Sequence, residues 1–317
     1  MNLPPIILIV SGSDSSGGAG MQADLGVARM TQIYPMTTVS CITSQNSKGF
    51  RKMQSVDPVL FADQLEAALS DHCPTVVKVG MLPSALHMDI LADMLERYPH
   101  GPVVFDPVMA PSDGENNFFA DWWEDSAVMH KFLKHVFLMT PNSVEVRRLA
   151  RPLIDKEGKG EAGEPEVNED VPFDPMDMVS AQFLKKEYGI KHVLITGGHS
   201  KRTPYTDFLV SDNDLQQPDE AILPAQALAV TPYEGEFIDT PNTHGTGCVF
   251  STAIACMLAK KMPVERAVHA AKMLVQLLLK AAKGIKFYDN IPGPVYLTLL
   301  SPDDESSLSQ APPPMMN

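Results

Sequence analysis

The stretch IILIVSGSDSSGGAGMQADLGVA, residues 6–28, decides how the chain folds. Its first five residues form a continuous apolar run that is typical of a buried strand. The run GSDSSGGAG that follows is a loop of small residues, and apolar residues then recur with helical spacing at Met21, Leu25 and Ala28. The stretch therefore predicts a strand, a loop and a helix, which is the repeating unit of an α/β sheet.

The same alternation continues along most of the chain. Further strands are predicted at 37–44, 76–80, 102–106, 136–140 and 192–198, and helices at 57–71, 84–98, 121–134 and 264–283. Asp57 and Pro58 form a helix start, and Gly284 closes the last helix. The runs at 205–211 and 233–239 predict antiparallel edge strands. We therefore expect an α/β protein with a mostly parallel central sheet and helices on both faces.

Composition limits the class of protein and its partners. The chain has 317 residues, of which 44% are hydrophobic, and we expect one packed domain over residues 1–300. The 25 basic and 39 acidic residues give a net charge of −14, and the basic residues form no stripe, so we expect no nucleic-acid partner. The N-terminal apolar run is too short to cross a membrane and follows no basic segment, so no membrane association is expected.

The cysteines indicate a cellular location, and two polar segments indicate where the chain leaves the packed domain. Cysteines at 41, 73, 248 and 256 contain no CxxC pair and are too few for a disulfide scaffold, so we expect a cytoplasmic protein. Residues 155–175 carry eight acids against two lysines, which predicts an acidic surface excursion. Residues 301–317 are also polar and proline-rich, and we expect a disordered tail there. We find no internal repeat.

A glycine-containing corner at NTHGTGC, residues 242–248, is the first candidate for chemistry. The apolar run after it predicts a buried helix that begins near Gly247 and holds Cys248 in its first turn. The free N–H groups and dipole of a helix start attract anions and can lower a thiol pKa. Gly245 and Gly247 tolerate unusual dihedral angles that would direct amides into one concavity. An ordinary turn followed by a small buried cysteine is the alternative.

The sequence matches neither the full dinucleotide-binding motif nor the Walker motif, two common glycine-rich nucleotide-binding patterns. GAGMQA, residues 18–23, satisfies a loose form of the dinucleotide-binding pattern. However, Gly18 lies well beyond the strand end at Val10, and no acid ends the second strand, which argues against a dehydrogenase. No GxxxxGK[ST] run occurs, so a Walker-type site is absent from the sequence. Ligands of open α/β sheets bind beyond the carboxyl ends of the strands, so the loops that follow the strands are the candidates.

Seven segments in order resemble one kinase family. They are GSDSSGGAGMQADL, SQN, VKVGML, VVFDPVM, TPNSVEV, LITGGH and NTHGTGC. Together they resemble the ribokinase superfamily, and most closely its hydroxymethylpyrimidine and phosphomethylpyrimidine kinase branch of vitamin kinases, which includes pyridoxal kinases. The resemblance extends from residue 6 to about 297. It implies a ribokinase-like three-layer α/β/α fold and ATP-dependent phosphorylation of a hydroxymethyl group on a small heteroaromatic ring.

The resemblance also implies roles for the corner at 245–248. Gly245, Thr246 and Gly247 would form the anion hole for the phosphoryl group during transfer. Cys248 stands where many members of the superfamily carry an aspartate base, and the pyrimidine kinase branch has cysteine there. His244 could assist as a nearby cation on the nucleotide side.

Further segments imply the metal and nucleotide sites. Asn142 and Glu145 of TPNSVEV would organise Mg²⁺ through water, with Asp106 nearby, although Glu145 taken alone reads as an exposed helix residue. Nucleotide-side residues would be Thr196, Gly198 and His199. Lys272 would lie near the adenine or the phosphates, and a solvated lysine is the alternative for it.

The acceptor side follows from the same resemblance. It implies Gly12, Asp24, Gln45, Met81 and Val108 around the ring, with Gln45 hydrogen-bonded to its edge and Met81 and Val108 as apolar walls. Asp24 could equally serve the helix dipole. The segment after Met109 lacks the family's usual TSG run. The resemblance therefore defines the class of reaction better than it defines the identity of the acceptor.

Three functions remain open on these residues. The first is a kinase for 4-amino-5-hydroxymethyl-2-methylpyrimidine and its monophosphate in thiamine precursor synthesis. The second is a pyridoxal or pyridoxamine kinase of the same fold, in which the thiol at 248 could add to an aldehyde. The third is a catalytically silent vitamin-binding protein. Exposed edge strands also suggest a homodimer.

Overall fold

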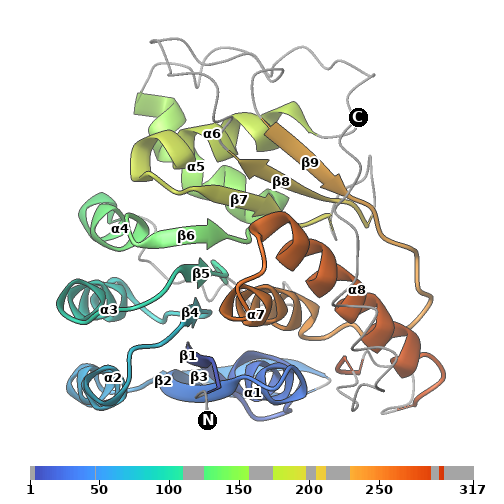
Figure 1. Cartoon of the computed structure of the whole chain (residues 1–317), viewed down its shortest axis with the longest axis horizontal. Helices are drawn as coiled ribbons and strands as arrows, with labels where there is room; N and C mark the ends of the chain where they lie inside the picture. Colours follow the sequence, from blue (N-terminus) through green and yellow to red (C-terminus); the bar gives the residue numbers. More distant parts are fainter. Residues whose placement is uncertain are drawn as a thin grey trace.

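The structure is a computed structural model, and it describes residues 4–46, 48–109, 125–156, 174–197, 205–211, 229–286 and 293–295. One mixed sheet runs through the molecule with helices on both faces, as Figure 1 shows. The strands are β1 (Ile6–Asp14), β2 (Tyr34–Asn46), β3 (Gly49–Ser55), β4 (Val76–Val79), β5 (Val103–Phe105), β6 (Val136–Met139), β7 (His192–Ile195), β8 (Asp207–Ser211) and β9 (Ala229–Tyr233). The helices are α1 (Gly20–Met30), α2 (Pro58–Asp71), α3 (Ala85–Arg97), α4 (Ser126–Leu133), α5 (Ser143–Lys156), α6 (Pro175–Tyr188), α7 (Thr246–Ala259) and α8 (Val264–Ala282).

The sheet has nine strands in the order β3-β2-β1-β4-β5-β6-β7-β8-β9. The six strands from β2 to β7 pair in parallel with one another, whereas β3, β8 and β9 pair antiparallel. The predicted mostly parallel α/β architecture is therefore confirmed. Because the carboxyl ends of parallel strands meet at one edge of the sheet, the loops after β1, β4, β5, β6 and β7 come together there.

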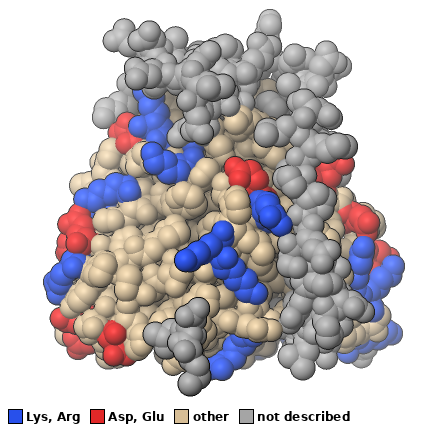
Figure 2. All heavy atoms as spheres, in the orientation of Figure 1, with Lys and Arg blue, Asp and Glu red and all other residues tan. Residues whose placement is uncertain are grey.

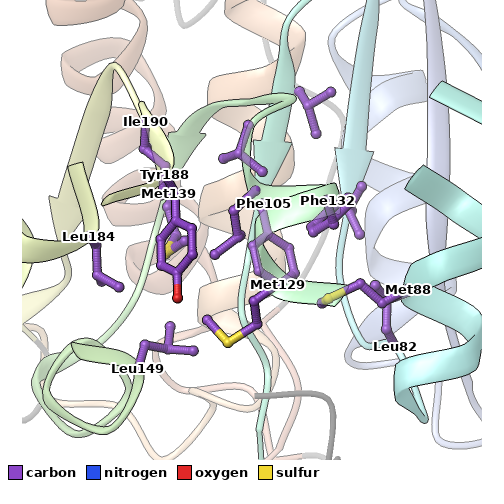
Figure 3. Packing of buried hydrophobic residues seen from close by; sticks show 14 of the residues in the cluster. Leu82, Met88, Phe105, Met129, Phe132, Met139, Leu149, Leu184, Tyr188 and Ile190 are labelled. Carbon is purple, nitrogen blue, oxygen red and sulfur yellow. The ribbon is translucent and has the colours of Figure 1, made fainter. Parts of the chain in front are cut away.

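Two separate apolar layers hold the helices to the sheet. Figure 1 shows α1, α7 and α8 on one face and α2, α3 and α4 on the other. On the second face the Phe105 and Phe132 rings meet edge to face with centroids 5.1 Å apart, and Met129 lies beside them in Figure 3. On the first face α7 is buried along almost its whole length. Each fully buried large apolar side chain stabilises the fold by roughly 1.5–3 kcal/mol. Packing on both faces therefore holds the strands, and the loops at their ends, in place.

Local signals set the helix ends as expected. The Asp57 side chain accepts hydrogen bonds from the amides of Val59 and Leu60, and Pro58 occupies the first helical position of α2. Helix α8 ends at Ala282, and Gly284 follows with a φ of +86°. An N-cap carboxylate and a glycine after the last turn satisfy backbone groups that the helix itself leaves free.

The structure differs from the sequence prediction in one predicted strand and in three elements that were not predicted. The run at 233–239 is not a strand; β9 covers Ala229–Tyr233, whose β-branched residues suit a strand better. Beyond Tyr233 the strand ends, and a side chain at Gly235 would collide with the carbonyl of Tyr205 and the side chain of Lys272. Edge strand β3 and helices α5 and α6 were not predicted from the sequence.

Some predictions fall on residues that the structure does not describe. These are most of the acidic excursion at 155–175, the tail at 301–317 and the first residues of the helix predicted at 121–134. On the face drawn in Figure 2, Lys and Arg side chains lie singly or in small groups among Asp and Glu. Within the described ranges, no helix is both long enough and apolar enough to cross a membrane.

Candidate active site

A pocket opens at the carboxyl edge of the sheet, between β1, β2 and the start of α7. It is lined by Ser11, Gly12, Ser13, Asp14, Ala19, Gly20, Thr43, Gln45, Phe50, Met81, Val108, His244 and Cys248. Four of the five predicted acceptor residues therefore share one cavity with Cys248 and His244. They come from four separate loops or strand ends of the chain, which only the parallel topology brings together.

The corner at 245–248 forms the start of α7, as predicted. Gly245 is the N-cap with a φ of +85°, and a Cβ there would overlap the carbonyl oxygen of Gly18. Thr246 donates its hydroxyl to the carbonyl of Thr243 over 2.6 Å. The prediction of unusual dihedrals at Gly247 is wrong, because Gly247 is helical; a Cβ there would point into open space. Of these two residues, Gly245 alone needs to be glycine for conformational reasons. The Thr246 amide donates to the Thr243 carbonyl over 3.2 Å.

Alanine at these two glycines is expected to have opposite structural effects. Gly245→Ala combines a left-handed φ with an overlap on the Gly18 backbone, so the free energy of unfolding should fall by at least about 1–3 kcal/mol. Gly247→Ala should leave the free energy of unfolding unchanged or slightly higher, since alanine is the better helix former. Urea unfolding of both variants measures this difference. Equal stability of the two variants would contradict the assigned backbone geometry.

Cys248 lies partly exposed at the pocket wall, and the amide of Gly20 donates to its sulfur. The prediction of a lowered thiol pKa is wrong for the free protein. Burial raises the pKa of Cys248 to about 12, and the charge of Lys78 offsets only part of this effect. Nearby Asp106 and Asp24 raise it further, so the helix start does not dominate the local field.

A buried ion pair lies behind the pocket. Lys78 of β4 donates to both carboxylate oxygens of Asp24 of α1 over 3.1 Å, and neither side chain is exposed. Thr252 of α7 donates to the same carboxylate over 2.6 Å. Burial alone would lower the pKa of Lys78, but Asp24, Cys248 and Asp106 together raise it. Asp24 therefore does not line the pocket as predicted, because it is sealed behind the wall and bound to Lys78.

Two carboxyl groups lie where the sequence predicted a metal site. Asp106 follows β5 and accepts from the hydroxyl of Ser251 over 3.1 Å. Glu145 accepts from the amide of Asn142, whose own side chain accepts from the amides of Val144 and Glu145. Burial and then the charge of Asp106 raise the pKa of Glu145 to about 8, which corrects the reading of Glu145 as an exposed helix residue. In the part of the chain described, no cluster of three or more metal-ligating side chains occurs.

The nucleotide-side residues are only partly described. Thr196 bridges to Asn142 at the neighbouring strand end. Lys272 is not a solvated lysine: it donates to Asp207 over 2.6 Å and to the carbonyl of Tyr205. Asp207 also accepts from the amide of Gly197 over 2.8 Å, which ties Lys272 to the loop after β7. Gly198 and His199 lie outside the described residues.

Several residues around the pocket were not singled out from the sequence. Asp14 is the last residue of β1 and Ser15 follows it, Lys78 lies in β4, and Asn242 precedes the corner at 245–248. The Asn242 amide donates to the carbonyls of Ala282 and Ile285 over 2.9 Å each, at the end of α8. All four lie inside the segments that carry the family resemblance, and a lysine within an apolar strand was the clearest signal that the sequence offered.

Comparison with known proteins agrees with this geometry. The sequence matches the phosphomethylpyrimidine kinase family over residues 14–293. The chain belongs to this family. It is therefore an ATP-dependent kinase of the ribokinase-like vitamin kinase group.

Three known proteins illustrate how similar this phosphomethylpyrimidine kinase family member is to its relatives in sequence and structure. A hydroxymethylpyrimidine/phosphomethylpyrimidine kinase of Staphylococcus aureus (strain Mu50 / ATCC 700699) is 30% identical over 278 residues, covering 87% of this chain and 88% of the relative. The structure of phosphomethylpyrimidine kinase from Clostridium difficile 630 is 26% identical with a TM-score of 0.64, covering 87% and 99%. Pyridoxal kinase from Staphylococcus aureus in complex with ADP is 25% identical with a TM-score of 0.70, covering 94% and 95%.

Proposed function

We propose that the protein transfers the γ-phosphoryl group of ATP to the hydroxymethyl group of 4-amino-5-hydroxymethyl-2-methylpyrimidine, and then to the resulting monophosphate. One observation carries this proposal. Gln45, Met81 and Val108 share a pocket with Cys248, at the start of α7. A ring held by these residues would present its substituent to the thiol and to the amides of the helix start. The relatives named for this reaction support the substrate class.

The residues of the pocket and of the helix start then have separate roles in phosphoryl transfer. Gln45 offers both a donor and an acceptor to the ring edge, whereas Met81 and Val108 cover its faces. Cys248 accepts the proton of the hydroxyl group as the oxygen attacks phosphorus. The helix start at Gly245, Thr246 and Gly247 stabilises the charge that develops on the transferring group, through its N–H groups and its positive dipole. The Thr246 amide, which donates to the Thr243 carbonyl over 3.2 Å, would exchange this partner for the phosphoryl oxygen. Thr196 and Lys272 belong to the nucleotide side.

Asp106 and Glu145 fit a hydrated Mg²⁺. This ion takes few carboxylates and keeps several waters, so two acidic side chains suffice. Without a cation, burial raises the pKa of both carboxyl groups, and the charge of Asp106 raises the pKa of Glu145 further. A divalent charge close to both groups would favour their ionised forms. When bound, the ion neutralises charge on the ATP phosphates.

Glu145→Gln is expected to change how stability depends on pH. The folded pKa of Glu145, about 8, lies above its ordinary value of 4.5, so the folded protein holds this proton more tightly. Its contribution to stability is complete below about pH 4.5 and is lost as the pH rises toward 8. Without metal, the wild type should therefore lose more stability than Glu145→Gln between pH 5.5 and 8 in thermal unfolding. Added Mg²⁺ at pH 8 should raise the Tm of the wild type more than that of the variant, and parallel pH curves would contradict the assignment.

A second candidate function is phosphorylation of pyridoxal. The Staphylococcus aureus pyridoxal kinase in complex with pyridoxal has a TM-score of 0.69 and 25% identity over 94% of this chain. Cys248 at the pocket wall could add to the aldehyde of such a substrate. The pocket residues described suit either flat ring, so turnover has to decide between them.

The deciding experiment measures ADP release with the pyrimidine alcohol and with pyridoxal at matched concentrations, with and without Mg²⁺. The proposal expects kcat/KM for the pyrimidine to exceed that for pyridoxal. A higher kcat/KM for pyridoxal would assign the second function, and no ADP release with either acceptor would indicate a catalytically silent binding protein.

Three broader features are part of the same proposal. We propose one kinase domain over 1–300 with an acidic surface excursion and a tail at 301–317, and a cytoplasmic location consistent with four free cysteines. A homodimer is proposed because β3 and β9 end the sheet as edge strands. Light scattering of the purified protein tests the oligomeric state.

A further inference from the structure

The end of β1 and the loop that follows it contact both sides of the pocket through two adjacent side chains, Asp14 and Ser15. Asp14 reaches toward the corner at 245–248, where phosphoryl transfer is proposed, and Ser15 reaches toward Gln45, where the ring is proposed to bind. Neither residue takes part in the chemistry proposed above. Their neighbouring positions mean that a shift of this loop would move both halves of the site.

Asp14 is held as an ionised acceptor. Its carboxylate accepts from the amides of Ser16, Gly18 and Ala19 over 2.8, 3.1 and 2.8 Å, and its side chain is only 2% exposed. Burial alone would raise the pKa of Asp14, but the contacts with His244, Ser16 and Ala19 hold it well below its usual range. A carboxylate with this many donors orders the whole turn from 14 to 19.

His244 connects the ordered turn at 14–19 to the start of α7. Its Nε2 lies 3.1 Å from Asp14 Oδ2. Its backbone is fixed separately, because its N–H donates to the carbonyl of Gly293 and its carbonyl accepts from the amide of Val295, each over 3.1 Å. The next residue, Gly245, packs directly on the Gly18 carbonyl. The turn at 14–19 and the start of α7 thus meet both through side chains and through backbone.

Ser15 holds Gln45 from the opposite side. Its hydroxyl donates to the Gln45 carbonyl over 2.8 Å and accepts from the Gln45 amide over 3.0 Å. The pairing of β2 with β3 shifts register between Ser44 and Gln45, so the regular ladder does not fix this residue by itself. Because both backbone groups of Gln45 are bound to Ser15, its side chain remains available to the pocket.

We propose that Asp14 and Ser15 are positioning residues that set the distance between the ring-binding side chain of Gln45 and the phosphoryl-binding amides at 245–247. The inference rests on the proposed function for the identity of these two halves. A misplacement of about 1 Å between reacting groups can cost about 10²-fold in rate. The two residues should therefore affect different kinetic constants, which a merely structural role would not do.

The test uses Asp14→Asn and Ser15→Ala in the full-length enzyme. Asp14→Asn removes acceptor capacity toward Ala19 and His244, so kcat should fall by about 10- to 100-fold with less change in KM for the acceptor. Ser15→Ala frees the Gln45 backbone, so KM should rise by about 10-fold with less change in kcat. Ser15→Thr, which keeps the hydroxyl, should recover the wild-type KM.

A second measurement does not depend on the substrate. Hydrogen exchange should accelerate at 243–249 in Asp14→Asn and at 43–46 in Ser15→Ala. His130→Gln is the matched control, since His130 contacts Glu187 over 2.9 Å on the surface and away from the pocket. It should change neither kinetics nor exchange at these segments.

The outcomes separate this inference from the proposed function. If the wild type phosphorylates neither ring alcohol, the proposed function fails, and the exchange pattern still decides the inference. A uniform fall in stability, with kcat and KM changed alike in both variants and no local change in exchange, would overturn the positioning role. A separate effect of each variant on its own segment supports it.

Discussion

Cys248→Ala is expected to lower kcat by about 10² to 10⁴, the usual contribution of a general base. The sulfur lies at the pocket wall at the start of α7, next to the residues proposed to hold the ring. Since alanine leaves the helix start and its amides in position, the dissociation constant for ATP should change little. A coupled assay of ADP release gives kcat, and calorimetric titration gives the affinity for ATP.

The matched control is Cys256→Ala, two turns further along the same helix. Cys256 is fully buried in the apolar cluster that includes residues of α1, α7 and α8, so its loss should lower stability and leave kcat close to that of the wild type. Near-normal turnover in Cys248→Ala would remove the thiol from the mechanism. Loss of turnover in both variants would point to packing of α7 instead.

The pH dependence gives an independent signature. A base works only when deprotonated, and burial raises the pKa of Cys248 to about 12 in the free protein. The value of kcat/KM, which reports on the free enzyme, should therefore keep rising with pH from 7 to 9 without levelling off. A plateau already at pH 7 would contradict the assignment of Cys248 as the base.

Lys78→Met is expected to cause the largest loss of stability, about 3–5 kcal/mol, because it leaves the Asp24 carboxylate buried without its partner. The contact from Thr252 remains, but one hydroxyl group does not compensate a sealed charge. Removing the ammonium also removes the main charge that lowers the pKa of Cys248, so this variant should alkylate more slowly at residue 248. Urea unfolding and iodoacetamide labelling measure the two effects.

Two comparisons identify the cause of this loss. The double variant Asp24→Leu/Lys78→Met removes both charges, and it should recover much of the stability lost in Lys78→Met. Lys280→Met breaks an exposed pair with Glu236 and should change stability little. If Lys280→Met and Lys78→Met lowered the free energy of unfolding equally, loss of the buried ion pair could not explain the effect of Lys78→Met.

The sequence predicted most of the fold because its strongest signals are local. Apolar runs such as 6–10 and 136–139 read as strands, and Asp57 with Pro58 marks a helix start that the structure repeats. The resemblance to a kinase family also identified Gly12, Gln45, Met81 and Val108, which share one pocket with Cys248. Four residues on separate strands and loops cannot be brought together by local sequence patterns alone, so this prediction depended on the family resemblance.

The failures have a physical cause in common, because they depend on tertiary contacts. Asp24 in the first turns of a helix looks available to a ligand, yet Lys78 in the neighbouring strand seals it behind the wall. The thiol at 248 looks activated by its helix start, yet burial beside Asp106 and Asp24 outweighs that dipole. Edge strand β3 lacks a strong apolar pattern and is formed only by pairing with β2.

The bond from Asn242 to the carbonyls of Ala282 and Ile285 sets a limit on how this enzyme can be altered. One residue inserted into α8 would rotate its last turn by about 100° and advance it by about 1.5 Å. The two carbonyls would then leave the amide that anchors the chain just before Gly245. The length of α8 is thus constrained by the segment just before the corner at 245–248, which is proposed to be catalytic. Insertions in α8 should therefore be destabilising even where the helix surface is open to solvent.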